Sequence, residues 1–237
     1  MEYSAVSHHP VGIQPDGPVL RSAKGLATAI TALLLAFIAI DLFSLFAGLN
    51  MHALMGRLMS DGFENVYFSD AALADALSMA AGALQVLGVL ATGTVFLIWF
   101  YRVRANAEVL TPGTCTMGKG WAIGSWFIPV GNYWLPFRIA RQTWDASFQG
   151  APEGSRRPRA ILFAWWFTWV ASDALGVAGA RLHSKVESPE SLQIATRIEM
   201  VSDAINIAAA VLAILVVRKL THRQQARHQH NPAAMAR

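Results

Sequence analysis

Two carboxylates stand inside stretches of this chain that are apolar enough to cross a membrane. Asp41 and Asp173 each lie seven residues before the far end of such a stretch, so we expect them at a similar depth. Ionisable groups at that depth usually face the interior of a helix bundle, where they can hold a cation or carry a proton. We therefore predict an intramembrane polar cluster of Asp41, Asp173 and Asn206. A purely structural cluster, whose hydrogen bonds fix helix register, is the alternative.

Metal-ligand and catalytic motifs are missing from the sequence. It contains no H-x-x-H, H-E-x-x-H or C-x-x-C spacing, so no metal site is predicted. It also contains no G-x-S-x-G motif and no glycine-rich phosphate loop, so no catalytic residue and no cofactor are predicted. The single cysteine, Cys115, excludes an internal disulfide. An intramembrane enzyme is therefore the least favoured of the functions considered.

Four arginines flank the central part of the chain in two pairs, Arg102 with Arg104 and Arg138 with Arg141. A guanidinium group has the planar geometry that suits phosphates and anionic lipid headgroups, so these four residues are candidates for binding a ligand or a lipid. The alternative is that they only orient the protein in the membrane and attract anionic lipid diffusely.

An apolar segment with breaks inside it separates these two arginine pairs. The run Gly120–Ser147 reads GWAIGSWFIPVGNYWLPFRIARQTWDAS and contains Pro129, Gly131 and Pro136. Because each proline removes a helical hydrogen bond, we expect two short helical pieces joined by a non-helical turn near Gly131 and Asn132. Asn132 is a candidate ligand-binding residue beside the freed carbonyls. Alternatively, its side chain satisfies the broken backbone or caps the next helix.

Tryptophans recur through the same segment and beyond it. Trp121, Trp126, Trp134 and Trp144 are most simply an aromatic belt at a membrane interface. An aromatic box around a ligand is the other interpretation, in which Trp126 is the candidate binding residue.

Composition and block length assign the chain to the integral membrane proteins. Of its 237 residues, 54% are hydrophobic and only 14% are charged. A spanning helix needs about 20 apolar residues, and four blocks meet that need. We predict an all-α membrane domain at residues 25–220, between a polar tail at 1–24 and a basic tail at 221–237. The predicted spans are residues 25–48, 77–101, 160–180 and 201–217.

The distribution of basic residues decides the topology. If the segment at residues 120–148 does not cross, fifteen Lys and Arg residues lie on one side of the membrane and four on the other. If it crosses, the two sides hold eight and eleven. The positive-inside rule favours the first arrangement. We therefore predict four spans, cytoplasmic termini, a re-entrant or interfacial element at 120–148, and a basic amphipathic helix after Pro136 with Trp144 on its apolar face.

Two runs in this central region carry a resemblance to a known family. WFYRVRANAEVL at Trp99–Leu110, followed by the Gly120–Ser147 run, resembles the bacterial membrane family catalogued as domain of unknown function 4328. The cluster of Trp165, Trp166 and Trp169 also fits this family. The resemblance covers about residues 25–220 and implies a multi-span membrane domain. It implies no activity.

The sequence therefore predicts a multi-pass protein of the bacterial inner membrane. The leading functional hypothesis is a non-enzymatic module that binds lipid or a protein partner at its cytoplasmic face. Anionic membrane lipids are the expected partners, a protein partner or a homo-oligomer is the other kind considered, and no nucleic acid is expected, because the basic residues gather at membrane edges. A small transporter or channel, lined by the broken segment, Asp41 and Asp173, is the alternative.

Overall fold

The computed structural model describes residues 20–62, 66–150 and 159–229, and these residues form helices, turns and loops without a β-strand. Residues 1–19 and 230–237, which are parts of the tails predicted at 1–24 and 221–237, and the loop at residues 151–158 lie outside the described residues. Four helices are long and apolar enough to span a membrane, which confirms the all-α fold class and the number of spans. They are α1 (Lys24–Asp61), α2 (Phe68–Leu110), α5 (Ala160–His183) and α6 (Pro189–Gln229).

Three of these helices are much longer than the spans predicted from hydropathy. The block predicted at residues 201–217 is the middle of α6, and that helix continues to Gln229, through the first part of the predicted basic tail. Likewise, α2 continues past its apolar block and ends at Leu110. Its C-cap residue, Thr111, directly precedes Pro112 and Gly113. Polar residues therefore extend the helices beyond the apolar core of the bundle.

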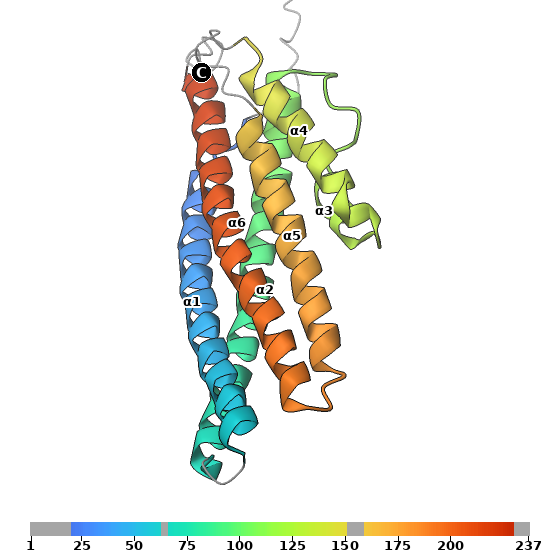
Figure 1. The fold of residues 1–237 in the computed structure, drawn as a ribbon. Helices are drawn as coiled ribbons and strands as arrows, with labels where there is room; N and C mark the ends of the chain where they lie inside the picture. Colours follow the sequence, from blue (N-terminus) through green and yellow to red (C-terminus); the bar gives the residue numbers. More distant parts are fainter. Residues whose placement is uncertain (1–19, 63–65, 151–158, 230–237) are drawn as a thin grey trace, which may run out of the picture.

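The four long helices form a curved row in the order α2, α1, α6, α5 (Figure 1). Small residues allow close approach inside this row, as is usual between membrane helices. A Cβ atom added at Gly88 of α2 would lie 2.4 Å from a ring carbon of Phe37 on α1. One added at Gly48 of α1 would lie 2.7 Å from Cγ of Met200 on α6. Because these glycines have no side chain, α1 can pack closely against α2 and α6.

Residues 111–148 leave the end of α2 and return to the same end of the bundle, and we call them the hairpin (Figure 1). The hairpin contains a single helical turn, α3 (Trp121–Gly124), the short 3-10 helices η2 (Ser125–Phe127) and η3 (Gly131–Tyr133), and the helix α4 (Leu135–Phe148). The end of the bundle where it begins and finishes also carries Lys24 and Gln229. We call this the basic end.

The turn of the hairpin lies at Val130. Its φ of 62° and ψ of −43° are rare for a residue with a branched side chain. The N–H of Gly131 donates to the carbonyl of Pro129 at 2.6 Å across this residue, which closes a tight three-residue turn. The prediction of helical pieces joined by a non-helical turn is therefore confirmed, but the turn is formed by residues 128–130, whereas Gly131 and Asn132, near which it was predicted, lie in η3. The backbone strain lies at Val130, one residue before the predicted Gly131.

Candidate functional site

The hairpin is docked on α5 through Tyr133, which follows the turn. The Tyr133 hydroxyl donates to Oδ2 of Asp173 at 2.6 Å, and Nε1 of Trp166 donates to the Tyr133 carbonyl at 3.1 Å. Trp166 lies six residues after the start of α5, which is roughly 9 Å along the helix axis. The backbone of Tyr133 therefore lies beside the first third of α5, and its phenol ring extends along α5 to reach Asp173.

Trp126 joins the two outermost helices of the row. Its ring lies 5.7 Å from Phe96 of α2 and 5.5 Å from Trp169 of α5, measured between centroids, and both contacts are edge-on. It also contacts Phe100 and Trp166. Because α2 and α5 are not close neighbours in the row, the hairpin fills the space between them at the basic end. The structure thus places Trp126, which is partly buried, against the core rather than in a purely membrane-facing belt.

The side chain of Asn132 does not take the structural role considered for it. Within the described residues it makes no hydrogen bond, and its Oδ1 atom is buried without a partner. Helix α4 begins without a side-chain cap. The backbone satisfies part of the break itself, because the N–H of Asn132 donates to the carbonyl of Ile128 at 3.0 Å. The expected hydrogen bond from Asn132 to the freed backbone, or to the start of α4, is therefore absent.

Three further polar atoms of the hairpin are buried without a partner in the described chain: one is Oε1 of Gln142 on α4, and two lie just before the turn. These two are Oγ of Ser125 and Nε1 of Trp126. A buried polar group without a partner costs about 1–3 kcal/mol, so three such groups within residues 125–132 are unusual. That Trp126 and Asn132 bind a ligand stays a prediction, and the unmet donors and acceptor mark where a polar ligand could bond.

Helix α4 is amphipathic, with its apolar face against the bundle. Ile139 and Trp144 on this face are almost fully buried. Arg138 and Arg141 lie on the opposite face and are exposed. At the hairpin turn, large apolar side chains are also exposed: Trp121, Phe127, Val130 and Trp134. The hairpin therefore presents an apolar turn next to two arginines.

The four arginines predicted as a clamp are not brought together. Arg104 is only 1% exposed, and its guanidinium donates to Oε2 of Glu108 and to the carbonyl of Met117, so it ties the start of the hairpin to α2. Arg102 instead donates to the carbonyl of Ser22 at 3.5 Å. Of these four arginines, only Arg138 and Arg141 share one exposed helix face, that of α4.

The predicted polar cluster forms in part. Asp41 is fully buried, as expected for a carboxylate that faces the bundle interior. Its Oδ2 accepts from Nδ2 of Asn206 at 2.7 Å, and its Oδ1 accepts from Nε2 of Gln85 at 3.3 Å. The same Gln85 nitrogen donates to Oδ1 of Asp203 at 2.9 Å. Asp41 and Asn206 are thus brought together, joined by two residues that the prediction left out.

Asp173 does not belong to this cluster. It pairs with Tyr133, while its neighbour Ser172 faces α6, where the Ser202 hydroxyl donates to the Ser172 carbonyl at 2.8 Å. Adjacent side chains on a helix point about 100° apart, and here Ser172 is buried while the Asp173 carboxylate is turned toward the hairpin. Similar depth was therefore a poor guide to proximity. A path lined by both Asp41 and Asp173 lacks support from these contacts.

A second polar network lies at the basic end and was not predicted. The side chain of Asn106 accepts from the N–H of Arg21 at 3.0 Å and donates to the Arg21 carbonyl at 2.9 Å. It also donates to Oε1 of Gln224 at 3.1 Å. Gln224 in turn donates to the Val103 carbonyl and to Oγ of Ser147, both at 2.9 Å. We call Asn106, Ser147 and Gln224 the amide network.

The amide network joins the segment before α1 to α2, α4 and α6. Beside it, Arg227 of α6 donates to the carbonyls of Ala146 and Leu110, so it holds both ends of the hairpin. Sequence patterns gave no signal for Gln224 or Arg227, because both lie in a polar stretch predicted to be a solvated tail. Near the start of the hairpin, burial raises the pKa of the Cys115 thiol, which favours its neutral form.

The comparisons with known proteins identify a family but no function. A family model described as Domain of unknown function (DUF4328) matches residues 64–222. This range includes α2, the hairpin, α5 and most of α6. No curated protein and no solved structure matches the chain.

Proposed function

This chain belongs to the DUF4328 family of unknown function, and we propose that it is a membrane module that binds anionic lipid headgroups through the hairpin. The observation that carries this proposal is the arrangement on α4. Arg138 and Arg141 share an exposed face, and neither makes an ion pair within the described residues. They lie next to the exposed apolar side chains of the hairpin turn.

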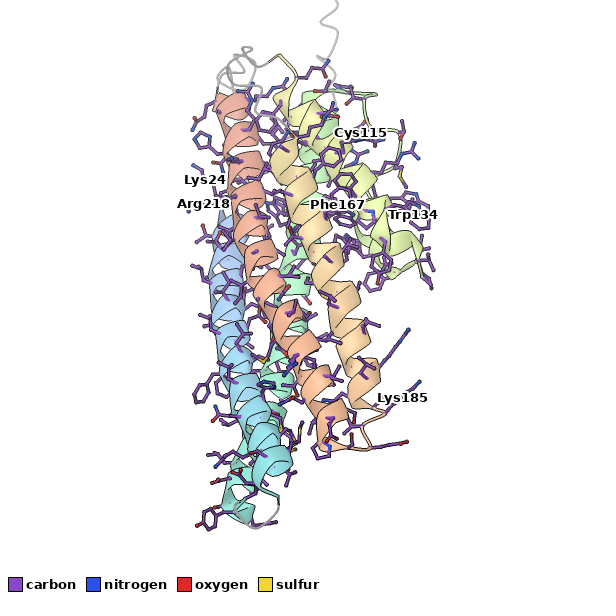
Figure 2. The ribbon with its side chains drawn as sticks, viewed as in Figure 1. Lys24, Cys115, Trp134, Phe167, Lys185 and Arg218 are labelled. Carbon is purple, nitrogen blue, oxygen red and sulfur yellow. The ribbon has the colours of Figure 1, made fainter. Side chains whose placement is uncertain are left out.

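The height of the hairpin in the bundle supports this proposal. Figure 2 shows Trp134 at nearly the same height along the bundle as Lys24 and Arg218. Basic residues at the ends of spanning helices usually mark the headgroup level, and tryptophan prefers the same zone. We therefore expect the turn to lie in the interface, with Phe127 and Val130 toward the acyl chains. Arg138, one helical turn after Trp134, is then at headgroup level.

The chemistry of this surface favours binding over catalysis. An exposed arginine pair offers positive charge and several hydrogen-bond donors, which suit a phosphate. It offers neither a nucleophile nor a general base. We therefore propose a non-enzymatic role, with phosphatidylglycerol-type headgroups as the ligand class.

Lipid titration tests this proposal. Purified full-length protein in dodecyl maltoside is titrated with dioctanoyl phosphatidylglycerol or with dioctanoyl phosphatidylcholine, and bound lipid is counted by native mass spectrometry. We expect a clear preference for phosphatidylglycerol. The double variant Arg138→Gln/Arg141→Gln should weaken its binding about 30-fold, because each basic residue near an anionic surface contributes about 1 kcal/mol.

A matched control removes two exposed arginines from the other end of the bundle. Arg181→Gln/Arg197→Gln changes the net charge equally but leaves the hairpin intact, so binding should be unchanged. Equal loss of affinity in the two double variants would show that only the total charge matters, and the proposed site would be wrong.

We also propose that the protein lies in the bacterial inner membrane with the basic end in the cytoplasm. The excess of Lys and Arg at that end supports this orientation. In a Cys115→Ser background, Gly154→Cys should resist a membrane-impermeant thiol reagent in intact cells, and Ser188→Cys should react. Labelling of Gly154→Cys in sealed cells would reverse the orientation.

A further inference from the structure

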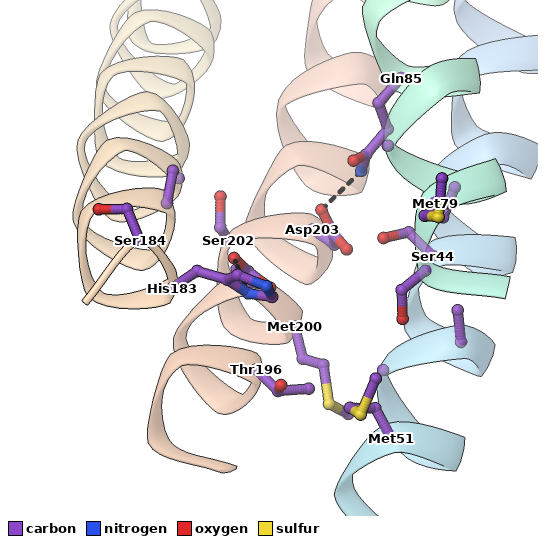
Figure 3. A pocket seen from close by; sticks show the side chains of 18 residues that line it. Ser44, Met51, Met79, Gln85, His183, Ser184, Thr196, Met200, Ser202 and Asp203 are labelled. Carbon is purple, nitrogen blue, oxygen red and sulfur yellow. Dashed lines mark hydrogen bonds and ion pairs between the residues drawn. The ribbon is translucent and has the colours of Figure 1, made fainter. Parts of the chain in front are cut away.

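The space between α2 and α5 is filled only at the basic end. The hairpin occupies that part, and toward the opposite end the structure has a cavity of about 590 Å³ between the four long helices. Its walls come from α1, α2, α5 with the turn after it, and α6 (Figure 3). The volume lies within the range of roughly 300–1,000 Å³ that is usual for small-molecule sites.

The cavity wall carries two carboxyl groups, and the one basic side chain among its described lining residues is His183. Asp203 and Glu199 line it, while no Lys or Arg is among its described lining residues. Asp203 accepts a hydrogen bond from Gln85, which is neutral, and makes no ion pair within the described chain (Figure 3). Within the described part of the chain, Glu199 forms an ion pair with His183 alone, with 3.4 Å between His183 Nδ1 and Glu199 Oε1.

The rest of the wall is apolar or small. Three flexible thioether side chains line it, from Met51, Met79 and Met200. Methionine adapts its shape to apolar ligands, and alanine and glycine residues complete the wall. The cavity therefore combines an acidic spot with an apolar surface.

Gly82 shows that this space is open. A Cβ atom added at Gly82 would meet no atom within 4 Å, although Gly82 lines the cavity. A larger side chain at this position can therefore occupy the cavity without displacing the protein. Gly93 lies on the same helix, is equally free of neighbours and does not line the cavity, so it provides a matched control.

We propose that this cavity binds a small amphiphilic cation, namely an organic ammonium with an apolar tail. The ammonium group lies against Asp203 and Glu199, and the tail packs along the methionine and glycine surface. An anion would meet two carboxylates, and a fully apolar molecule would add no polar partner to those that Gln85 and His183 already provide. This site lies at the opposite end from the proposed lipid site and does not depend on it.

Calorimetry with hexylammonium chloride tests the proposal directly. The protein is placed in phosphatidylcholine nanodiscs, which removes the anionic lipid that the hairpin is proposed to bind, and the heat from empty nanodiscs is subtracted. We expect saturable binding of hexylammonium and none of hexanol or hexanoate. Asp203→Asn should weaken binding about tenfold or more, because one close charged partner is lost. Gly82→Leu should abolish binding, and Gly93→Leu should not change it.

Cysteine modification gives an independent measurement. In a Cys115→Ser background, Ser78→Cys places a thiol in the cavity wall, and Ser60→Cys places one on the exposed end of α1. The rates of modification by two methanethiosulfonate reagents are compared, one with a trimethylammonium group and one with a sulfonate group. The ratio of the trimethylammonium rate to the sulfonate rate should be higher at Ser78→Cys than at Ser60→Cys. Hexylammonium should slow the reaction at Ser78→Cys only.

These results decide the proposal even if one variant fails to fold. Saturable hexylammonium binding that Gly82→Leu removes and Gly93→Leu keeps would support it, as would selective protection of Ser78→Cys. It would be overturned if hexylammonium neither binds nor protects, or if Gly82→Leu and Gly93→Leu bind it equally. The phosphatidylglycerol preference of the hairpin would be unaffected in either case.

Discussion

Removing Gln224 is expected to loosen the basic end of the bundle. This side chain is 3% exposed and makes three hydrogen bonds inside the amide network, to Asn106, Ser147 and the Val103 carbonyl. Gln224→Leu keeps a similar volume and removes all three. The adjacent Gln225 is the matched control, because its amide nitrogen is buried without a partner within the described chain.

The expected loss of stability in Gln224→Leu depends on which hydrogen bonds its three former partners keep. Asn106 still bonds to Arg21, the Ser147 hydroxyl still donates to Thr143, and the Val103 carbonyl remains within the helical ladder. Because no partner is left without any bond, each lost hydrogen bond costs about 1 kcal/mol. We therefore expect Gln224→Leu to lower the free energy of unfolding by about 2–3 kcal/mol after the gain from burying leucine.

Thermal unfolding, followed by tryptophan fluorescence in detergent, measures the difference. A loss of 2–3 kcal/mol corresponds to a decrease in Tm on the order of 5–10 °C for a chain of this size. Gln225→Leu should leave Tm unchanged or raise it, because it removes an unsatisfied amide. In a double-mutant cycle, Asn106→Ala and Gln224→Leu should show a coupling of about 1 kcal/mol.

Equal Tm values for the two glutamine variants would refute this reasoning. The result would mean that the amide network adds nothing beyond what solvent supplies at those positions. Additive effects of Asn106→Ala and Gln224→Leu would likewise show that the hydrogen bond between them is of no consequence.

Three further substitutions test the packing and the hairpin by the same Tm assay. Gly88→Ala should lower the free energy of unfolding by about 1–3 kcal/mol, because the added Cβ would lie 2.4 Å from the ring of Phe37. Gly93→Ala, whose Cβ would meet no atom within 4 Å, should not destabilise the protein. Equal effects of the two substitutions would contradict the observed packing of α2 on α1. Tyr133→Phe removes the 2.6 Å hydrogen bond from the hairpin to Asp173 of α5, so it should lower the free energy of unfolding by about 1–2 kcal/mol and speed proteolysis of the hairpin. An unchanged rate of proteolysis would count against this docking. Val130→Gly should raise stability by up to about 1–2 kcal/mol by relieving the positive φ, and a loss would show that the turn is unstrained.

Sequence reasoning located the apolar spans and the broken segment because both depend on local chemistry. Four blocks of apolar residues predict four helices in lipid, and Pro129 and Pro136 cannot lie inside an undisturbed helix. The exposed faces of α4 also follow from spacing alone, so Arg138 and Arg141 emerged as predicted. These features require no knowledge of what packs against what.

Pairings between distant elements could not be predicted in this way. Asp41 and Asp173 have similar depth in the sequence, but the rotation of α5 turns Asp173 toward Tyr133. Arg104 was predicted as a surface charge, and the hairpin buries it. Gln224 lies where hydropathy indicates a solvated tail, since a polar helix buried by other polar groups leaves no apolar pattern.

The two hydrogen bonds between the Asn106 side chain and the Arg21 backbone bear on the order in which the helices assemble during synthesis. The two residues are separated by 85 positions, and the glutamine that completes the contact comes 118 positions after Asn106. The two hydrogen bonds between Arg21 and Asn106 can form once α2 has been made, but the hydrogen bond from Asn106 to Gln224 can form only after the last turns of α6 have been made. A nascent chain stopped before Gln224 would therefore carry the four long helices with an incomplete amide network at the basic end.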